Sequence, residues 1–379
     1  MIEAALAHQE VYGNKDLLDV ILRYVDLLCK TFGPGNDQLH GYPGHPEIEL
    51  SLLRLYQRTG NEKHLKLAEF FLTERGNPKG WNGRHYYDVE AEKRGDDPNR
   101  MPAFYPEPRC MWYNQAHAPI VEQTTIEGHS VRAMYLLTAA ADLVATPGAK
   151  SDQMLLQAVH GLWQNMVQKK MYVTGGIGAM QQWEGFGKDY YLPQGTDEGG
   201  CYAETCAAIG VMMLAERLLQ VSRDLSPNTQ RCTNQTQIEL DGRFGDIMEL
   251  CFYNAVLTTM SHDGRAFSYD NQLASSDKDP NARAKWFTVA CCPPNMLRLL
   301  GQIGGYTWTH RAGVDSQAAE LFVHLFVPST YSSDDLEVSQ ESDWPWSEDI
   351  RFSVKKAPND FRMKVRVPAW AEDYKVRIE

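Results

Sequence analysis

The sequence predicts a mainly α-helical fold of repeated helical hairpins, which form an α/α toroid and lead into a β-sheet region. Two stretches show the repeat, because each joins two apolar helical segments through a Gly-Asn break, first at Gly13-Asn14 and then at Gly60-Asn61. Apolar residues recur at helical spacing on both sides of each break, which is typical of stacked hairpins. From about Leu321, apolar and polar residues alternate instead, and this pattern predicts strands.

In chain order, the helical pattern predicts four hairpins and one further helix. They cover residues 2–31, 47–75, 129–170 and 203–257, followed by a helix from Asn295 to about Trp308. Hairpins of this length either stack as an open solenoid or close into a toroid. The long loops at 76–125 and 173–202 favour the toroid, in which such loops gather at one mouth of the ring. A polar insertion from about Arg223 to Leu240 is expected on the surface.

We place the boundary between the two regions after residue 312, so that a helical domain covers 1–312 and part of a sheet domain covers 313–379. We expect the chain to be truncated at both ends. Met1 leads into an amphipathic helix without a cap, and the last residues lie inside a predicted strand. We therefore expect a fragment whose helical ring is incomplete at its N-terminal side.

Composition and charge narrow the class of protein. The chain has 379 residues, of which 43% are hydrophobic and 23% charged, as in globular proteins. A net charge of −12 argues against a nucleic-acid partner, and no apolar run is long enough to span a membrane. The start of the chain lacks a signal-peptide pattern, so we expect a cytoplasmic protein. The sequence is also compatible with a homodimer.

Two short clusters of thiols and one carboxylate suggest a metal site. Glu204 and Cys206 lie where the fourth hairpin begins, and the adjacent Cys291 and Cys292 precede two prolines. Three thiols and a carboxylate suit a thiophilic divalent metal such as zinc. Residues two apart on a helix point in different directions, so Glu204 and Cys206 can share a metal only in a loop or a first turn. Unrelated buried cysteines and a disulfide remain open as alternatives.

The loops are rich in histidine, glutamate and aromatic residues. His45 precedes a predicted helix, His129 opens the third hairpin, and Glu184 stands among aromatic residues and glycines. Such loops suit sugar binding, because rings stack on sugar faces and carboxylates act as acid, base or hydroxyl acceptor. Simpler interpretations also stay open, since each histidine can be a hydrogen-bonded structural residue and Glu184 a solvated loop charge.

Five segments that occur in one order give a more specific indication. They are Gly41-Tyr-Pro-Gly-His-Pro-Glu-Ile-Glu49, Glu127-Gly-His-Ser-Val-Arg-Ala133, Trp183-Glu-Gly-Phe-Gly-Lys-Asp-Tyr190, Ala203-Glu-Thr-Cys-Ala207 and Ala290-Cys-Cys-Pro-Pro-Asn295. This series resembles glycoside hydrolase family 127, the β-L-arabinofuranosidases, over almost the whole chain. The resemblance implies an (α/α)6 barrel followed by a β-sandwich, and retaining cleavage of terminal β-L-arabinofuranosyl units from an oligosaccharide or a glycoprotein glycan.

The resemblance also implies roles for individual residues. Glu204, Cys206, Cys291 and Cys292 match the ligands of a zinc ion, Zn²⁺. Cys291 also matches the nucleophile, and Glu184 matches the general acid/base. The residues that match the lining of the sugar subsite are His45, His129, Glu249 and Tyr269. The chain departs from the family by extra residues between Glu184 and Glu204 and by the insertion at 223–240.

Two other functions stay open at this point. The chain could be a non-catalytic helical scaffold, in which three cysteines and Glu204 hold a structural zinc ion. It could instead be an α/α-toroid glycosidase or lyase that uses two carboxylates, Glu184 and an aspartate such as Asp189.

Overall fold

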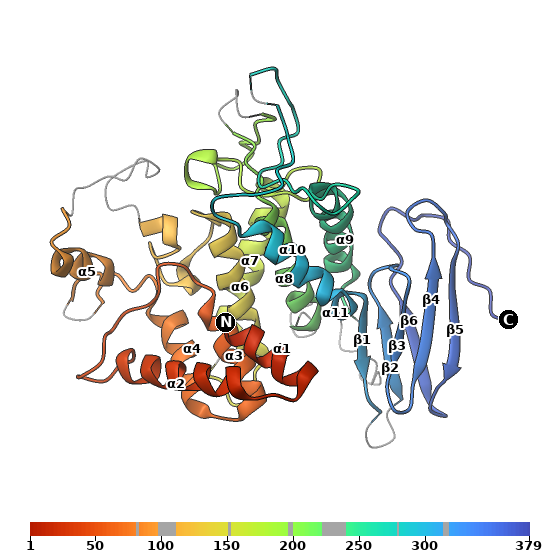
Figure 1. The fold of residues 1–379 in the computed structure, drawn as a ribbon, viewed down its shortest axis with the longest axis horizontal. Helices are drawn as coiled ribbons and strands as arrows, with labels where there is room; N and C mark the ends of the chain where they lie inside the picture. Colours follow the sequence, from red (N-terminus) through yellow and green to blue (C-terminus); the bar gives the residue numbers. More distant parts are fainter. Residues whose placement is uncertain are drawn as a thin grey trace.

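The computed structural model describes residues 1–80, 83–97, 111–150, 153–195, 200–221, 240–278, 280–313 and 318–379. Helices fill the first part of the chain, and two small sheets follow (Figure 1). Within the described residues, no helix is both long enough and apolar enough to cross a membrane.

The first two hairpins form as predicted. They consist of α1 (Ile2–Tyr12) with α2 (Asp16–Thr31), and of α3 (Ile48–Thr59) with α4 (Glu62–Glu74). Gly13 and Gly60 end the first helix of each pair in a left-handed conformation, with φ of 65° and 67°. Asn14 and Asn61 each accept a hydrogen bond from the amide two residues further on. In each Gly-Asn break, glycine therefore ends one helix and asparagine prepares the next.

The later helices follow the same plan with local differences. They are α5 (Tyr86–Arg94), α6 (Ser130–Ala145), α7 (Gln153–Lys169), α8 (Thr205–Val221), α9 (Gly242–Cys251), α10 (Cys292–Gly301) and α11 (Ile303–Thr307). Helix α5 was not predicted, and residues 223–239 of the predicted insertion lie outside the described residues. The prediction that the last helix begins at Asn295 was wrong. It begins at Cys292, because Pro293 and Pro294 occupy its first turn, where proline needs no amide partner.

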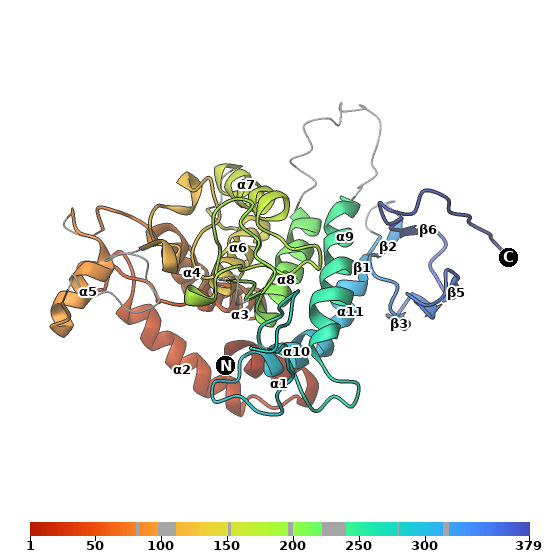
Figure 2. The ribbon, with the colours of Figure 1, turned by 90° about the horizontal axis from the view of Figure 1, so that it is seen from above.

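The helices form two layers around a common core. Inner helices α1, α3, α6, α8 and α10 pack against one another in this order. Helices α6 and α8 are buried along most of their length, and Figure 2 shows them at the centre with α2 and α7 outside. Glu3 of α1 pairs with Arg54 of α3 and with Arg298 of α10, which links the first and last inner helices. The predicted α/α barrel fold is confirmed.

Two three-stranded sheets complete the fold. The first contains β1 (Trp308–Arg311), β2 (Ala319–Val323) and β6 (Phe361–Val365), and the second contains β3 (Ser329–Ser332), β4 (Glu337–Ser342) and β5 (Ile350–Lys356). Strand β2 pairs antiparallel with β1 and parallel with β6. The first strand begins at Trp308, earlier than the predicted start near Leu321. Trp308 is buried in the small core that the sheets share, so it belongs to the β region.

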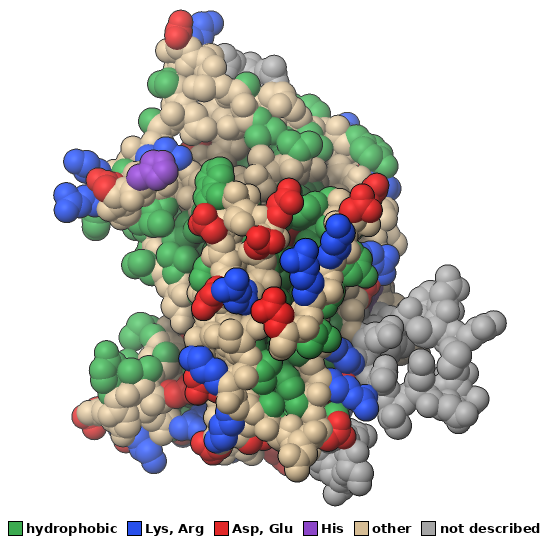
Figure 3. Space-filling view, turned by 90° about the vertical axis from the view of Figure 1, so that its right-hand side faces the viewer, with side chains coloured by type: hydrophobic (Ala, Val, Ile, Leu, Met, Phe, Trp, Pro, Cys, Tyr) green, Lys and Arg blue, Asp and Glu red, His purple; other side chains and the backbone are tan. Residues whose placement is uncertain are grey.

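Arg366 joins the β region to the helical barrel. Its guanidinium contacts Asp246 and Glu249 of α9, each at 2.5 Å, and its Nε donates to the carbonyl oxygen of His324 at 2.7 Å. Figures 1 and 2 both place the sheets beside α9 and α11. The outer face of this region carries acidic and basic side chains interspersed rather than separated by sign (Figure 3). One buried cation therefore anchors the sheets to the barrel.

We predict that Arg366→Met lowers the free energy of unfolding by about 3–5 kcal/mol, because it leaves the buried carboxylate of Glu249 without a charged partner. Chemical denaturation of both proteins measures the difference. The control is Arg243→Met, which removes an ion pair whose arginine is 81% exposed and should cost less than about 1 kcal/mol. Equal losses in the two variants would contradict the anchoring role of Arg366.

Candidate active site

The predicted metal ligands come together at the start of two inner helices. Glu204 directly precedes α8 and Cys206 lies in its first turn, where residues two apart can face one point. Cys291 is the N-cap of α10, and Cys292 is its first residue. Helices α8 and α10 are neighbours in the inner layer, so their N-termini bring both pairs of residues to the same place.

Short distances define the cluster of Glu204, Cys206, Cys291 and Cys292. The Sγ atom of Cys292 lies 3.5 Å from Sγ of Cys206 and 3.6 Å from Sγ of Cys291. Oε1 of Glu204 lies 3.3 Å from Sγ of Cys291 and 3.7 Å from Sγ of Cys292. All four ligand atoms are within 4.8 Å of one another. The described cysteines are all free thiols, so the disulfide alternative is wrong for this cluster.

The donor set fits a thiophilic divalent ion. In a tetrahedral site with metal–sulfur bonds of about 2.3 Å, neighbouring sulfurs are about 3.8 Å apart, close to the distances seen here. Oε2 of Glu204 is buried without a hydrogen-bond partner, and a buried carboxylate in that state needs a cation or a proton. The cluster is thus a candidate metal centre with four protein ligands.

The thiols of the cluster differ in their environment. Cys206 and Cys292 are buried, whereas Cys291 is only half-buried. Hydrogen bonds from the thiols of Cys206 and Cys292 lower the pKa of Cys291, and the hydroxyl of Tyr269, 3.1 Å from its Sγ, acts in the same direction. Burial opposes this shift. Cys291 is therefore the thiol that is most easily deprotonated and most accessible.

Glu184 stands beside the cluster in a constrained backbone. It follows a short 3-10 turn (Gln181–Trp183) and has a left-handed φ of 53°. A Cβ atom on the next residue, Gly185, would lie 2.0 Å from the carbonyl oxygen of Gly128, so only glycine allows this approach. The carboxylate of Glu184, the ring of His129 and the carboxylate of Glu204 each place one atom within 4.8 Å of the others.

Both carboxylate oxygens of Glu184 are held. Nε2 of His129 lies 2.9 Å from Oε2, and the hydroxyl of Tyr202 donates to Oε1 at 3.0 Å. The hydrogen bond from His129 lowers the pKa of Glu184, and burial partly offsets this effect. Burial lowers the pKa of His129 itself, and the hydrogen bond to Glu184 opposes this shift. Glu184 is therefore a carboxylate in a fixed orientation.

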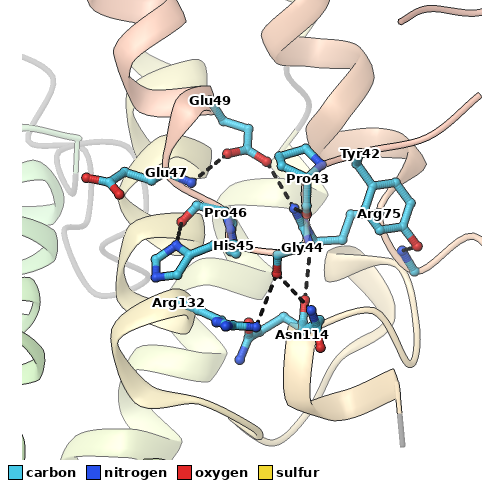
Figure 4. A network of polar contacts seen from close by, with 12 residues as sticks. Tyr42, Pro43, Gly44, His45, Pro46, Glu47, Glu49, Arg75, Asn114 and Arg132 are labelled. Atoms are coloured by element: carbon cyan, nitrogen blue, oxygen red, sulfur yellow. Dashed lines mark hydrogen bonds and ion pairs between the residues drawn. The ribbon is translucent and has the colours of Figure 1, made fainter. Parts of the chain in front are cut away.

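His45 lies next to His129 on a loop that Arg75 supports (Figure 4). The centroids of the His45 and His129 rings are 6.1 Å apart, and burial lowers the pKa of His45 to about 4. The guanidinium of Arg75 is almost fully buried and donates to the carbonyl oxygen of Pro43 at 2.7 Å and to Glu49 at 3.2 Å. The loop before α3 therefore presents His45 as a neutral imidazole in a rigid position.

The structure does not bring every predicted residue to the site. Glu249 lies in α9, and its carboxylate contacts Arg366 and the indole nitrogen of Trp370, both from the β region. None of its described contacts is with the cluster, so we leave Glu249 out of the site. Asp189 pairs with two lysines and is no partner for Glu184, which removes the support for the two-carboxylate alternative.

Sequence analysis missed Tyr202. Its hydroxyl contacts Glu184, although 18 residues separate the two along the chain. The available signal was its place in Cys201-Tyr-Ala-Glu204, two residues before the first predicted metal ligand. Position alone gave no reason to expect contact with a side chain 18 residues earlier in the chain.

Comparisons with known proteins identify relatives of the whole chain. The family model described as "Beta-L-arabinofuranosidase, GH127 catalytic domain" matches residues 1–305, and the model of the GH127 middle domain matches residues 320–379. The non-reducing end β-L-arabinofuranosidase of Bifidobacterium longum subsp. longum is 32% identical over 384 residues. The match covers 98% of this chain and 53% of that protein, so the chain spans about half the length of this relative.

Solved structures agree with these matches. Ara127N-Se, a GH127 β-L-arabinofuranosidase from Geobacillus stearothermophilus T6, superimposes with a TM-score of 0.81 at 36% identity, over 97% of this chain and 54% of that one. The GH127 β-arabinofuranosidase BT3674 superimposes with a TM-score of 0.76 at 32% identity, over 98% of this chain and 49% of that one.

We predict that Cys206→Ser loses a bound divalent metal ion and lowers the melting temperature by more than about 5 °C, because the ligands join segments far apart in the chain. Metal analysis and thermal unfolding measure the two effects. Cys29→Ser is the control, since Cys29 donates only to the carbonyl oxygen of Lys63 and lies outside the cluster. A metal content that is unchanged in Cys206→Ser would refute the proposed ligand set.

Proposed function

The chain belongs to glycoside hydrolase family 127, and we propose that it is a zinc-dependent retaining glycosidase that releases terminal β-L-arabinofuranosyl units. The substrate would be an oligosaccharide or the glycan of a glycoprotein. The observation that carries this proposal is the position of Glu184. Two hydrogen bonds hold its carboxylate next to Glu204 of the cluster, in which Cys291 is the half-buried thiol. A proton-transfer group and a sulfur nucleophile would thereby act at one mouth of the barrel.

Zinc would be held by Glu204, Cys206, Cys291 and Cys292. When bound, it would keep Cys291 in the thiolate form near neutral pH. The shared burial of the other three residues suits a fixed metal site, because their exposed fractions are only 1–2%. The more accessible Cys291 is the ligand that a sugar can reach.

In the first half of the proposed reaction, Sγ of Cys291 attacks the anomeric carbon while the bond from that carbon to the leaving oxygen breaks. Glu184, in its protonated form, gives its proton to the leaving oxygen. A bound sugar that displaces water from the Glu184 carboxylate favours this protonated form. The product is a sugar linked to Cys291 through sulfur, with its anomeric configuration inverted.

In the second half, water attacks the same carbon while the carbon–sulfur bond breaks. Glu184, now a carboxylate, accepts a proton from this water, and Cys291 leaves as a thiolate. The second inversion restores the original configuration, so the overall result is retention. His45, His129 and Tyr269 would surround this position and contact the hydroxyl groups of the sugar.

A structural zinc site on a non-catalytic scaffold is the second interpretation. Four protein ligands are typical of structural zinc sites, and this cluster would supply four. The partial exposure of Cys291 and the pair of hydrogen bonds that orient Glu184 both favour catalysis instead.

We predict that Cys291→Ser reduces the hydrolysis of an aryl β-L-arabinofuranoside by at least about 10³-fold, because a serine hydroxyl is a much weaker nucleophile. Release of the phenol measures the rate, and NMR of the first-formed sugar shows its configuration. The Cys29→Ser variant should keep full activity. Turnover by Cys291→Ser at the rate of the unsubstituted chain would exclude the sulfur nucleophile. If the unsubstituted chain binds zinc but shows no turnover, the structural interpretation is favoured.

We further predict that Glu184→Ala keeps its metal but loses turnover, and that azide restores the reaction of a substrate with an activated aryl leaving group. Azide needs no general base, so it can replace water in the second step and should give a glycosyl azide of retained configuration. Asp189→Asn is the matched control and should keep most of the activity. Strong loss in Asp189→Asn with azide rescue would instead identify Asp189 as the acid/base.

A further inference from the structure

Backbone contacts attach Glu184 to one side of the barrel mouth. Its carbonyl oxygen accepts hydrogen bonds from the amide and the hydroxyl of Ser130, at 3.1 and 2.9 Å. His129, the residue before α6, contacts Oε2 of the same carboxylate. All of these partners belong to the start of α6, so they hold Glu184 against that helix. Backbone hydrogen bonds also join the segment before α8 to Gly178 and Ala179, but they do not orient the carboxyl group of Glu184.

Tyr202 holds Glu184 from the other side. It lies in the segment that leads into α8, and its hydroxyl donates to Oε1 of Glu184 at 3.0 Å. The backbone carbonyl of Tyr202 accepts a hydrogen bond from the amide of Asn271 at 3.0 Å, which fixes the segment. Its ring contacts that of Tyr269, with centroids 6.1 Å apart, and the hydroxyl of Tyr269 lies 3.1 Å from Sγ of Cys291.

We propose that Tyr202 is a positioning residue that fixes the carboxyl group of Glu184 relative to Cys291. This inference rests on the proposed function, which makes Glu184 the acid/base and Cys291 the nucleophile. A retaining glycosidase needs these two groups at a set separation, about 5 Å when both are carboxylates. Among the described side chains, the hydroxyl of Tyr202 supplies the hydrogen bond that ties the carboxylate to the segment bearing the metal ligands. Tyr202 is only 8% exposed, so water cannot easily replace that hydroxyl.

The role predicts a dependence on the leaving group that a merely structural role would not produce. Proton donation by Glu184 matters most when the leaving oxygen is a poor leaving group, such as that of a sugar or an alkyl alcohol. An acidic phenol leaves without much help. Displacement of Glu184 should therefore slow the cleavage of a substrate with a sugar or alkyl leaving group much more than that of an aryl substrate.

The test compares Tyr202→Phe with Tyr172→Phe. The hydroxyl of Tyr172 is also buried in a neighbouring loop, but it donates to the carbonyl oxygen of Pro193. For each variant, kcat/KM is measured with a β-L-arabinofuranosyl disaccharide and with a nitrophenyl β-L-arabinofuranoside, together with the zinc content. Tyr202→Phe should lose about 10- to 100-fold on the disaccharide, the effect of one hydrogen bond to a charged group, and much less on the nitrophenyl substrate. Tyr172→Phe should change kcat/KM by the same factor for both substrates.

Each result decides between the alternatives. Equal losses on the two substrates, no loss on either, or loss of zinc from Tyr202→Phe would overturn the positioning role while leaving the proposed function intact. A failure of the proposed function looks different: the unsubstituted chain would bind zinc without turnover, or Glu184→Ala would be fully active. Either of these results would overturn the positioning role as well.

Discussion

The inner helices of the barrel begin at a common mouth, and the position of every proposed site residue depends on this arrangement. His129 is the N-cap of α6, Glu204 directly precedes α8, and Cys291 is the N-cap of α10. The first amide groups of a helix have no partner within it, and its N-terminus carries a positive partial charge. Three such ends place partial positive charge beside the thiols, although burial raises the pKa of Glu204. The chemistry of the site thus depends on helix packing.

Constrained backbone surrounds the same point. Gln115, Glu184, Cys201 and Ala203 have positive φ values of 55°, 53°, 66° and 41°. Such conformations of non-glycine residues cost of order 1–3 kcal/mol each and persist where neighbouring contacts hold them. The side chain of Gln115, for example, donates to the carbonyl oxygen of His129, and that of Asn271 donates to the carbonyl oxygen of Ala203. The contacts fix the segments on both sides of Glu184 and Glu204 in one conformation.

Buried charges support the loops from behind. Arg75 and Glu49, both almost fully buried, hold the loop that carries His45. Lys170 is 3% exposed and contacts the carbonyl oxygen of Ile126 and the carboxylate of Glu127, just before His129. Desolvation offsets much of the attraction within a buried ion pair, so such pairs contribute little net stability. Here their directional hydrogen bonds determine where the histidines of the mouth lie.

The sequence by itself determined the features that depend on neighbouring residues. Gly13 and Gly60 mark helix ends because glycine tolerates the left-handed conformation, and the chemistry of three thiols and a carboxylate indicated the candidate metal site. Only the tertiary structure decided contacts between distant segments. It turned Glu249 towards Arg366, 117 residues away, and brought Tyr202 to Glu184. Periodicity and capping are local, whereas the direction of a side chain across the barrel depends on how whole helices pack.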